Sequence, residues 1–358
     1  MNRRIEKLRA IMRTQQLDFL LVTDKANRRY LSGFTGSNGL LVVGLQEVFL
    51  ILDGRYTEQA QQQTQEVTIY ITSHEKDQWQ YLCEIVGPHT VGFEAVTASY
   101  ATYQGLKTIC TESQLVETKQ WVEQLRLVKE TSELQAIQKA AIIADQTFAH
   151  LLTRIQPGMS ELEVANEIDY YSKQMGSEGP AFETIVASGV RTALPHAHAS
   201  KKIIQANELI MIDFGCIVDG YYSDMTRTFA LGEVDDSIRQ VYEAVLAAQQ
   251  TAIETIAVGQ PLKVLDQSAR QFLAQHELAE QFTHNLGHGI GLTCHEYPSL
   301  DLSNEQPIVP QMVFTVEPGV YLAGRFGIRI EDDIFVKADG TIESLTKTPK
   351  EWMVLPCN

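Results

Sequence analysis

The fold of the second half of the chain is decided by residues 209–228, which read LIMIDFGCIVDGYYSDMTRT. Asp219-Gly220 lies between two apolar runs, and this dipeptide is a strong signal for a two-residue β-hairpin loop because both residues tolerate a positive φ. Pairing outward from that loop places Asp213 opposite Thr226. The segment therefore predicts an antiparallel strand pair with its polar residues in a defined register.

The same register predicts a pair of neighbouring carboxylates. Asp224 would face Gly215, so Asp213 and Asp224 would lie diagonally on one face, at a separation that a cation can bridge. Two unit charges about 4 Å apart repel by about 4 kcal/mol at an effective dielectric constant of 20. A single aspartate here would be read as a solvated strand end, whereas the pair favours a metal site.

A second group of candidate residues lies at 284–296, which read HNLGHGIGLTCHE. Three of the nine histidines of the chain, His284, His288 and His295, fall within this segment. Glycines on both sides of His288 let the backbone pass close to whatever the ring binds. Taken alone, the segment fits a glycine-rich turn with surface histidines equally well.

A third group lies in two apolar runs, 313–319 and 327–333. Each run carries a glutamate between apolar neighbours, where burial without a partner costs several kcal/mol. The even spacing of Glu317 and Glu331 means that a three-residue loop would place them opposite one another, with Arg329 on the same face. An Arg–Glu salt bridge is the alternative explanation of this group.

Together the three groups supply four carboxylates and one imidazole: Asp213, Asp224, His288, Glu317 and Glu331. This oxygen-rich set suits Mn²⁺, Co²⁺ or Fe²⁺ better than a structural zinc ion, which prefers thiolates. Two divalent ions would balance the charge of the four carboxylates. A dinuclear centre is therefore expected, and it would activate a bridging water and polarise a carbonyl group.

The remaining sequence indicates two domains. Up to about residue 125, short β-rich runs alternate with helical ones, which is typical of a small α/β domain. From 126 to 358, helices and strands are grouped, which favours an α+β domain. Two capping boxes predict helix starts in this part, Ser132 with Gln135 and Ser160 with Glu163. We therefore expect an N-terminal domain at 1–125 and a catalytic domain at 126–358.

Composition excludes several classes of function. The 358 residues carry 29 basic and 45 acidic side chains, a formal net charge of −16. No basic cluster suited to phosphate contacts is present, so we expect no nucleic-acid partner. No apolar run approaches the roughly 18 residues of a membrane helix, and we expect a cytoplasmic protein without a membrane partner. The five scattered cysteines indicate neither a disulfide framework nor a thiolate zinc site.

In this order and spacing, the residues resemble those of the pita-bread metallopeptidases, specifically the two-domain Xaa-Pro branch of aminopeptidase P and prolidase. The resemblance covers nearly the whole chain. It implies a creatinase-like N-terminal domain and a pita-bread catalytic domain. It also implies that the five residues above are the metal ligands, with Asp224 and Glu331 contacting both ions, and that Mn²⁺ is preferred, with Co²⁺, Fe²⁺ or Zn²⁺ as alternatives.

The resemblance also assigns roles around the ligands. His196, in the run ALPHAH at 193–198, matches the substrate-side histidine of the family, and His295 and Arg329 match its catalytic and substrate-positioning groups. His284 matches a further substrate-binding histidine. Glu317 could take a proton from the water and pass it to the departing proline nitrogen, while His196 or His295 stabilises the oxyanion. His198 replaces the usual pattern, and we interpret it as an exposed bystander.

The expected function is removal of the first residue from proline-containing peptides that begin Xaa-Pro, as in aminopeptidase P. A prolidase restricted to Xaa-Pro dipeptides is the alternative, and a catalytically silent binding protein with this fold is a more remote one. A methionine aminopeptidase would not need the 125 or so residues ahead of the metal half. The family also implies a homodimer, in which Asp53-Gly-Arg55-Tyr56 would reach a partner's site; a turn leading into a helix explains that motif equally well.

Overall fold

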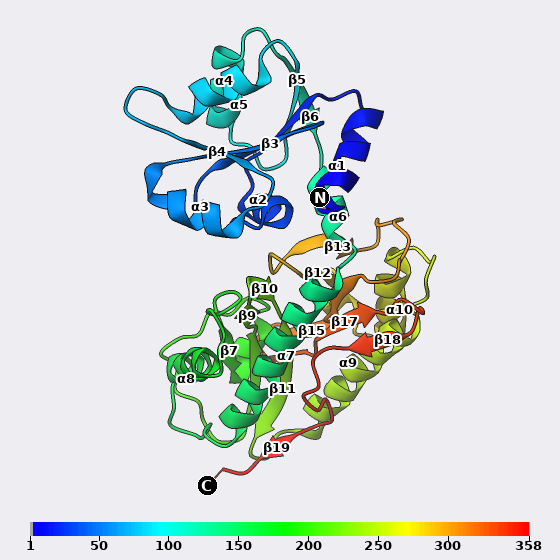
Figure 1. Cartoon of the computed structure of the whole chain (residues 1–358). Coiled ribbons are helices and arrows are strands. Elements are labelled where there is room, and N and C mark those ends of the chain that lie inside the picture. The colour runs from blue at the N-terminus through cyan, green and yellow to red at the C-terminus, as the bar shows by residue number, and fades with distance from the viewer. Residues whose placement is uncertain (1–2, 358) are drawn as a thin grey trace. The chain divides into compact units, whose positions relative to one another are not determined.

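The computed structural model describes residues 3–357. The chain divides into two compact units, Met1–Arg126 and Leu127–Asn358. Figure 1 traces the chain through both units, from blue at the N-terminus to red at the C-terminus. Each unit has its own apolar core.

Unit 1 is built on a six-stranded mixed sheet with the order β4-β3-β2-β1-β5-β6. Its strands are β1 (Phe19–Val22), β2 (Leu40–Gly44), β3 (Val48–Leu52), β4 (Thr68–Ile71), β5 (Thr90–Glu94) and β6 (Gln114–Thr118). β2 pairs antiparallel with both β1 and β3, whereas the outer pairs are parallel. The predicted small α/β domain is thereby confirmed.

Helices cover both faces of this sheet. They are α1 (Arg3–Thr14), α2 (Lys25–Ser32), α3 (Thr57–Gln63), α4 (Gln78–Val86), α5 (Tyr100–Ile109) and α6 (Trp121–Arg126). α4 and α5 lie on one face, and α2 and α3 lie on the other (Figure 1). Alternate strand residues such as Val42 and Val91 pack with Leu82 of α4 and Leu106 of α5 in one buried cluster, as expected for strands whose side chains alternate between two covered faces.

Unit 2 contains two larger sheets and two short ribbons. The four-stranded sheet has the order β19-β11-β8-β7 and comprises β7 (Ile185–Ser188), β8 (Glu208–Phe214), β11 (Met225–Leu231) and β19 (Val354–Leu355). The five-stranded sheet has the order β13-β12-β14-β17-β18 and comprises β12 (Gly287–Gly289), β13 (Glu296–Leu300), β14 (Val313–Val316), β17 (Asp332–Val336) and β18 (Ile342–Ser344). The ribbons pair β9 (Ile217–Val218) with β10 (Tyr221–Tyr222), and β15 (Gly319–Leu322) with β16 (Phe326–Arg329).

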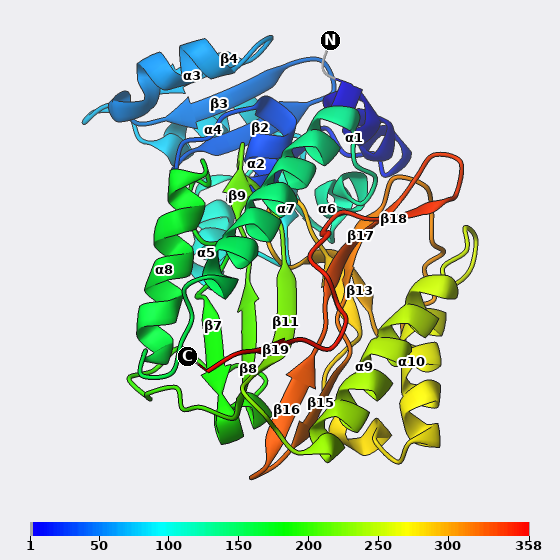
Figure 2. The same cartoon turned by 90° about the horizontal axis from the view of Figure 1, so that it is seen from below.

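Two pairs of helices flank these sheets. They are α7 (Thr131–Leu152) with α8 (Glu161–Gln174), and α9 (Asp236–Glu254) with α10 (Lys263–Gln275). α7 and α8 lie beside β7, β8 and β11, and α9 and α10 lie on the opposite side of the unit (Figure 2). Each pair buries its own apolar cluster against the sheet that it covers. This grouped arrangement confirms the predicted α+β class.

One predicted helix start is wrong and the other is confirmed. α7 begins with a capping box between Glu130 and Glu133 rather than between Ser132 and Gln135. The backbone N–H of Glu130 donates to the Glu133 side chain at 2.9 Å, so Glu130 and Glu133 take the places that Ser132 and Gln135 were expected to hold. Ser160 and Glu163 form the expected reciprocal pair at the start of α8.

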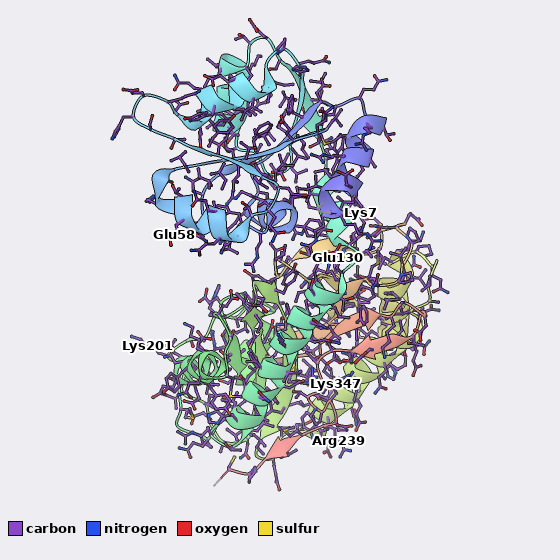
Figure 3. The ribbon with its side chains drawn as sticks, viewed as in Figure 1. Lys7, Glu58, Glu130, Lys201, Arg239 and Lys347 are labelled. Atoms are coloured by element: carbon purple, nitrogen blue, oxygen red, sulfur yellow. The ribbon has the colours of Figure 1, made fainter. Side chains whose placement is uncertain are left out.

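The surface of unit 2 is rich in charge, in contrast to the acids buried inside it. Lys201, Arg239 and Lys347 are exposed and project outward from the ribbon (Figure 3). Among residues 3–357, no helix combines the length and the apolar composition that crossing a bilayer requires.

Candidate metal centre

The hairpin at 213–226 holds the first two acidic residues as predicted. Asp219 and Gly220 have φ values of 47° and 63° and form the loop between β9 and β10. Asp213, near the end of β8, pairs with Thr226 of β11. Asp224 lies just before β11, and its backbone N–H donates to the side chain of buried Asp333 at 3.0 Å. The turn therefore fixes where both aspartates stand.

A second hairpin positions the two glutamates. Gly319 pairs with Arg329 across the β15–β16 ribbon, and Val316 pairs with Asp332 across β14 and β17, so the register is continuous through a three-residue loop at 323–325. Glu317 and Glu331 occupy the breaks between these strand pairs, opposite one another. The predicted register is confirmed, and the strand breaks free both glutamates from the ladder.

His288 enters from β12 with its ring orientation fixed. Its Nδ1 lies 3.1 Å from the carbonyl oxygen of Gly289, which accepts a proton only if Nδ1 carries it. Nε2 is then the basic nitrogen, and it lies 3.7 Å from Asp224 and 3.4 Å from Glu317. This tautomer is the one that a metal-binding histidine needs.

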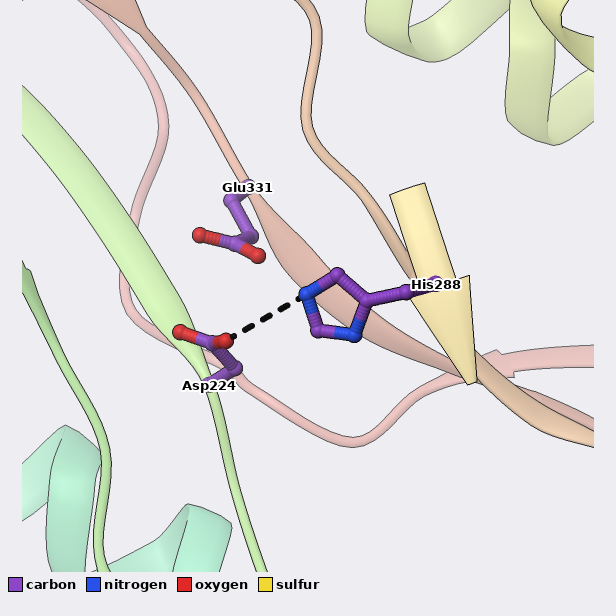
Figure 4. A group of neighbouring side chains, drawn as sticks. All are labelled: Asp224, His288 and Glu331. Carbon is purple, nitrogen blue, oxygen red and sulfur yellow. Dashed lines mark ion pairs between the residues drawn. The ribbon is translucent and has the colours of Figure 1, made fainter. Parts of the chain in front are cut away.

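Asp224, His288 and Glu331 form the tightest group of possible ligands. Each offers one ligand atom, and the three atoms lie within 4.8 Å of one another. Figure 4 shows the three side chains pointing toward a common point from three separate segments, with the contact between His288 and Asp224 dashed. Residues that are far apart in the sequence thus converge in one place.

Asp213 and Glu317 complete the set at the edge of this group. The Nη2 atom of Arg329 donates to Oδ2 of Asp213 at 2.6 Å. Thr315 donates to Oε1 of Glu317 at 3.1 Å, the same oxygen that faces His288. All five residues that the sequence singled out as metal ligands therefore line one cavity of about 520 Å³.

The same cavity also brings together the other predicted site residues: His196, His284, His295 and Arg329. The rings of His295 and His288 lie with their centroids 4.2 Å apart and their planes tilted by 39°. His196 and His295 are both exposed, whereas Arg329 is buried behind Asp213. His196 and His295 thus stand at the accessible side of the cavity.

The hydrogen bonds of His284 indicate which of its ring nitrogens carries the proton. Arg329 donates to the hydroxyl of Tyr321 at 2.6 Å, so that hydroxyl donates its own proton to Nε2 of His284, 3.0 Å away. Nδ1 lies 2.8 Å from the carbonyl oxygen of Asn285 and carries the ring proton. Burial, together with the charge of Arg329, lowers the pKa of His284 to about 4. This ring is neutral at pH 7.

The carboxylates repel one another strongly in the protein alone. Burial first, and then the charges of Asp213 and Asp333, raise the pKa of Asp224 well above its usual range. Burial and the charge of Asp224 do the same to the pKa of Glu331. Burial also raises the pKa of Glu317 to about 8. A set of acids whose ionisation is disfavoured in this way requires protons or cations.

The donor set fits divalent metal ions. Oδ1 of Asp213 and Oδ1 of Asp224 are buried, and neither has a hydrogen-bond partner among residues 3–357. Buried carboxylate oxygens are rarely left without a partner, because each costs the free energy of its lost hydration. Oxygen ligands with one imidazole suit ions such as Mn²⁺, and a structural zinc site would offer thiolates instead.

Two residues of the site were missed by the sequence reasoning. Thr226 donates its hydroxyl to Glu331 at 2.5 Å and accepts from Nε of Arg329 at 3.0 Å. Its place opposite Asp213 was predicted, and that register was the signal that could have identified it. Tyr321, which links Arg329 to His284, lies four residues after Glu317 without any motif to mark it.

Two further interpretations are affected by the structure. His198 lines the cavity and pairs with Glu183 at 2.9 Å, so it is exposed but is not remote from the site. Asp53 caps a short 3₁₀ turn, Gly54–Tyr56, and also pairs with exposed Arg55 at 2.8 Å. This motif therefore forms a turn leading into α3 within unit 1, as its simpler explanation expected.

The chain matches two protein-family models. The model of metallopeptidase family M24 matches residues 135–338. The model of the creatinase/prolidase N-terminal domain matches residues 4–128.

Three similar proteins are named Xaa-Pro dipeptidase or X-Pro aminopeptidase. A curated relative from Pyrococcus furiosus, named Xaa-Pro dipeptidase, is 34% identical to this chain. The alignment covers 98% of this chain and 99% of the relative. The solved structure of an Xaa-Pro dipeptidase from Bacillus anthracis is 38% identical, with a TM-score of 0.94 over 98% of this chain and 99% of that one. The solved structure of an X-Pro aminopeptidase from Thermotoga maritima is 36% identical, with a TM-score of 0.87. The alignment covers 96% of this chain and 99% of that one.

Proposed function

The chain belongs to metallopeptidase family M24, and from this premise we propose that it is an Xaa-Pro peptidase of pita-bread fold that works with two divalent metal ions. The proposed ligands are Asp213, Asp224, His288, Glu317 and Glu331. One observation carries the proposal: buried carboxylates, two of them with an oxygen that has no hydrogen-bond partner among residues 3–357, converge around His288, whose Nε2 faces Asp224 and Glu317. Asp224 and Glu331, at the centre of the group, are the proposed ligands of both ions.

Bound ions would lower the pKa of a shared water molecule and polarise the scissile carbonyl group. We assign Mn²⁺ as the preferred ion, with Co²⁺, Fe²⁺ or Zn²⁺ as alternatives, because hard oxygen ligands dominate the site. Arg329 holds Asp213 from behind, and Thr226 holds Glu331, so two of the carboxylates are oriented before any ion arrives.

The residues beside the carboxylates supply the proton transfers. The departing proline nitrogen has no N–H, so it leaves as an amine only if a proton reaches it. Glu317 lines the cavity with Oε1 turned toward Nε2 of His288, and a carboxylate in this position is a competent general base. We assign Glu317 this shuttle, from the attacking water to the proline nitrogen.

Histidines at the accessible side of the cavity have the complementary role. His196 and His295 are the proposed donors to the oxyanion that forms at the scissile carbonyl. His284 is neutral and held by Tyr321, so it is assigned to contact substrate through its apolar ring edge rather than through a charge.

Substrate length distinguishes the two candidate functions, Xaa-Pro dipeptidase and aminopeptidase P. We propose Xaa-Pro dipeptides as the main substrates, because relatives from Pyrococcus furiosus and Bacillus anthracis that align over nearly the whole chain are named Xaa-Pro dipeptidase. An aminopeptidase acting on longer peptides, the function expected from the sequence, is the second candidate, and the Thermotoga maritima structure favours it.

One assay tests both parts of this proposal. Protein stripped with a chelator and reloaded with Mn²⁺, Co²⁺ or Zn²⁺ is given Ala-Pro, Ala-Pro-Ala and, as control, Ala-Ala. We expect hydrolysis of Ala-Pro only after reloading, fastest with Mn²⁺, and little action on Ala-Ala. Preferential cleavage of Ala-Pro-Ala would transfer the assignment to aminopeptidase P. Full activity in the stripped protein would contradict the metal centre. The proposed homodimer is checked on the same sample by light scattering.

A further inference from the structure

Unit 1 brings two cysteines into contact at the C-terminal ends of neighbouring helices. Cys83 lies in the last turn of α4, and its carbonyl oxygen accepts the N–H of Gly87, which ends that helix. Cys110 ends α5 directly. The two sulfur atoms are 3.1 Å apart, although 27 positions separate the residues in the sequence. The fold therefore joins thiols that no sequence motif connects.

The surroundings of this pair are apolar. Cys110 is buried in the cluster that α4 and α5 form with the sheet, and Cys83 packs against the edge of the same cluster, where it is only half-buried. Burial, with the hydrogen bond to Cys83, raises the pKa of Cys110 to about 12. A metal site or a nucleophile needs a thiolate, which this environment disfavours. The contact suits a different chemistry, in which the sulfurs bond to each other.

We propose that Cys83 and Cys110 form a dithiol that closes to an intrachain disulfide when the protein meets a low-molecular-weight disulfide, and reopens with a thiol reductant. This inference concerns unit 1 alone and does not depend on the proposed peptidase function.

The exchange balances without any other reactant. Cys83 is the more accessible thiol; as its thiolate it attacks one sulfur of the small disulfide, forms a mixed disulfide and releases a small thiolate. Cys110 then loses its proton to solvent and attacks the sulfur of Cys83, and a second small thiolate leaves. The two small thiolates take up the two protons lost by the protein. Two electrons pass from the protein to the reagent.

The position of Cys110 determines the character of the reaction. Its sulfur already touches that of Cys83, so the second step starts from a near-attack geometry. Its high pKa makes that step slow, since few molecules carry the thiolate at any moment. The same environment offers no stabilisation to the reduced thiolate form, so the closed bond resists reduction. The bond would connect α4 to α5, which both cover one face of the sheet, and would stabilise unit 1 by restricting its unfolded chain.

The test counts free thiols in the full-length protein loaded with Mn²⁺. The protein is equilibrated in buffers of rising glutathione disulfide to glutathione ratio, quenched with acid, and then unfolded and alkylated with N-ethylmaleimide near pH 6.5. Free thiols are counted by intact mass and peptide mapping. We expect the number of alkylated cysteines to fall from five to three, with one peptide pair joining Cys83 to Cys110, and to return to five with dithiothreitol. Cys357→Ser, at an exposed cysteine near the C-terminus, is the matched control and should keep the link.

Other outcomes would overturn the inference. Five free thiols across the whole range of buffers, a stable glutathione adduct on Cys83 that never resolves, or a link that pairs Cys83 with Cys357 would each do so. In Cys83→Ser the link must disappear, with Cys110 still alkylated. Peptide mapping of the unsubstituted protein decides the question even if that variant does not fold.

Discussion

Unit 2 contains two buried acidic regions that lie next to each other in the sequence. They differ in whether cationic side chains neutralise the carboxylates. Glu331 belongs to the cavity, where carboxylate faces carboxylate and its pKa is raised. Asp332, the next residue, accepts hydrogen bonds from Arg227 and Lys350 at 2.7 and 2.6 Å. Burial alone would raise the pKa of Asp332, but these two cations outweigh it and lower that pKa below its usual range.

This difference separates structural charge from functional charge. The Asp332 cluster carries its own cations, with Gln249 and Thr346 donating to the remaining lone pairs, so it needs nothing from outside. In the cavity, Arg329 is the counter-charge of Asp213, and two carboxylate oxygens have no hydrogen-bond partner within the described part of the chain, 3–357. A buried charge that lacks a counter-charge is costly. In the cavity, the proposed metal ions would supply the missing counter-charge.

Of the substitutions considered, Asp224→Asn should have the largest effect, a loss of activity. A small loss would contradict the contrast between the two acidic regions. Losing one ligand of the proposed centre removes several kcal/mol of transition-state stabilisation, which corresponds to a loss of about 10³-fold or more in kcat/KM for Ala-Pro. The metal-free variant should unfold at the same or higher urea concentration than the metal-free parent, because one repelling charge is gone.

Asp219→Asn is the matched control, since it makes the same change in the exposed hairpin loop. It should leave both kcat/KM and the urea midpoint unchanged. Near-normal turnover in Asp224→Asn would remove that residue from the metal site.

Asp332→Ala should act in the opposite direction on stability. It leaves buried Arg227 without its carboxylate partner and frees Lys350, which is partly exposed. Breaking a buried ion pair in this way costs roughly 3–5 kcal/mol. Urea unfolding with and without Mn²⁺ measures this loss, and both conditions should show it. Asp339→Ala, in an exposed turn, serves as control. A loss under about 1 kcal/mol would mean that the cluster is no more stabilising than a surface pair.

The dependence of stability on pH sharpens the comparison. An acid whose pKa is raised on folding binds more protons in the folded than in the unfolded state, so stability falls as pH rises. For Glu317 the window runs from its ordinary value of 4.5 to about 8, and Asp224 and Glu331 act in the same sense. Metal-free protein should therefore be more stable at pH 5 than at pH 8.

Mn²⁺ should reverse this slope, because ions bind the deprotonated ligands and stabilise the folded state more as pH rises. Asp332 affects the pH dependence only at low pH: its pKa is lowered on folding, so its stabilisation is present above its ordinary value of 3.8 and is lost as pH falls through the folded value. Denaturation midpoints at several pH values, with and without Mn²⁺, provide the measurement. Equal slopes in both series would contradict the assignment of the three acids.

Local chemistry explains which parts of the site could be predicted. Asp219-Gly220 specifies its own hairpin, because positive φ values at two adjacent residues are compatible with few other structures. The spacing of Glu317 and Glu331 around a glycine-containing loop works in the same way. In each case the register follows from the turn, and a period of two then decides which side chains share a face.

Other parts could not be predicted because they depend on contacts between segments. The start of α7 depends on which side chains reach which backbone N–H groups, and Glu130 with Glu133 forms the capping box in place of Ser132 with Gln135. Thr226 and Tyr321 matter because Arg329 lies between them, 103 and 8 positions away. The position of His198 at the cavity follows from a bridge between its backbone and that of Ile185.

The sequence by itself determined the two hairpins, the grouped order of helices and strands, and the identity of the acids that share a face, because turn chemistry and side-chain periodicity act over a few residues. Only the tertiary structure decided that Asp224, His288 and Glu331 meet at one point, and that Asp332 is neutralised while Glu331 is not. The physical reason is that burial and counter-charge are properties of three-dimensional neighbours, and Glu331, just before β17, has different neighbours from Asp332, the first residue of that strand.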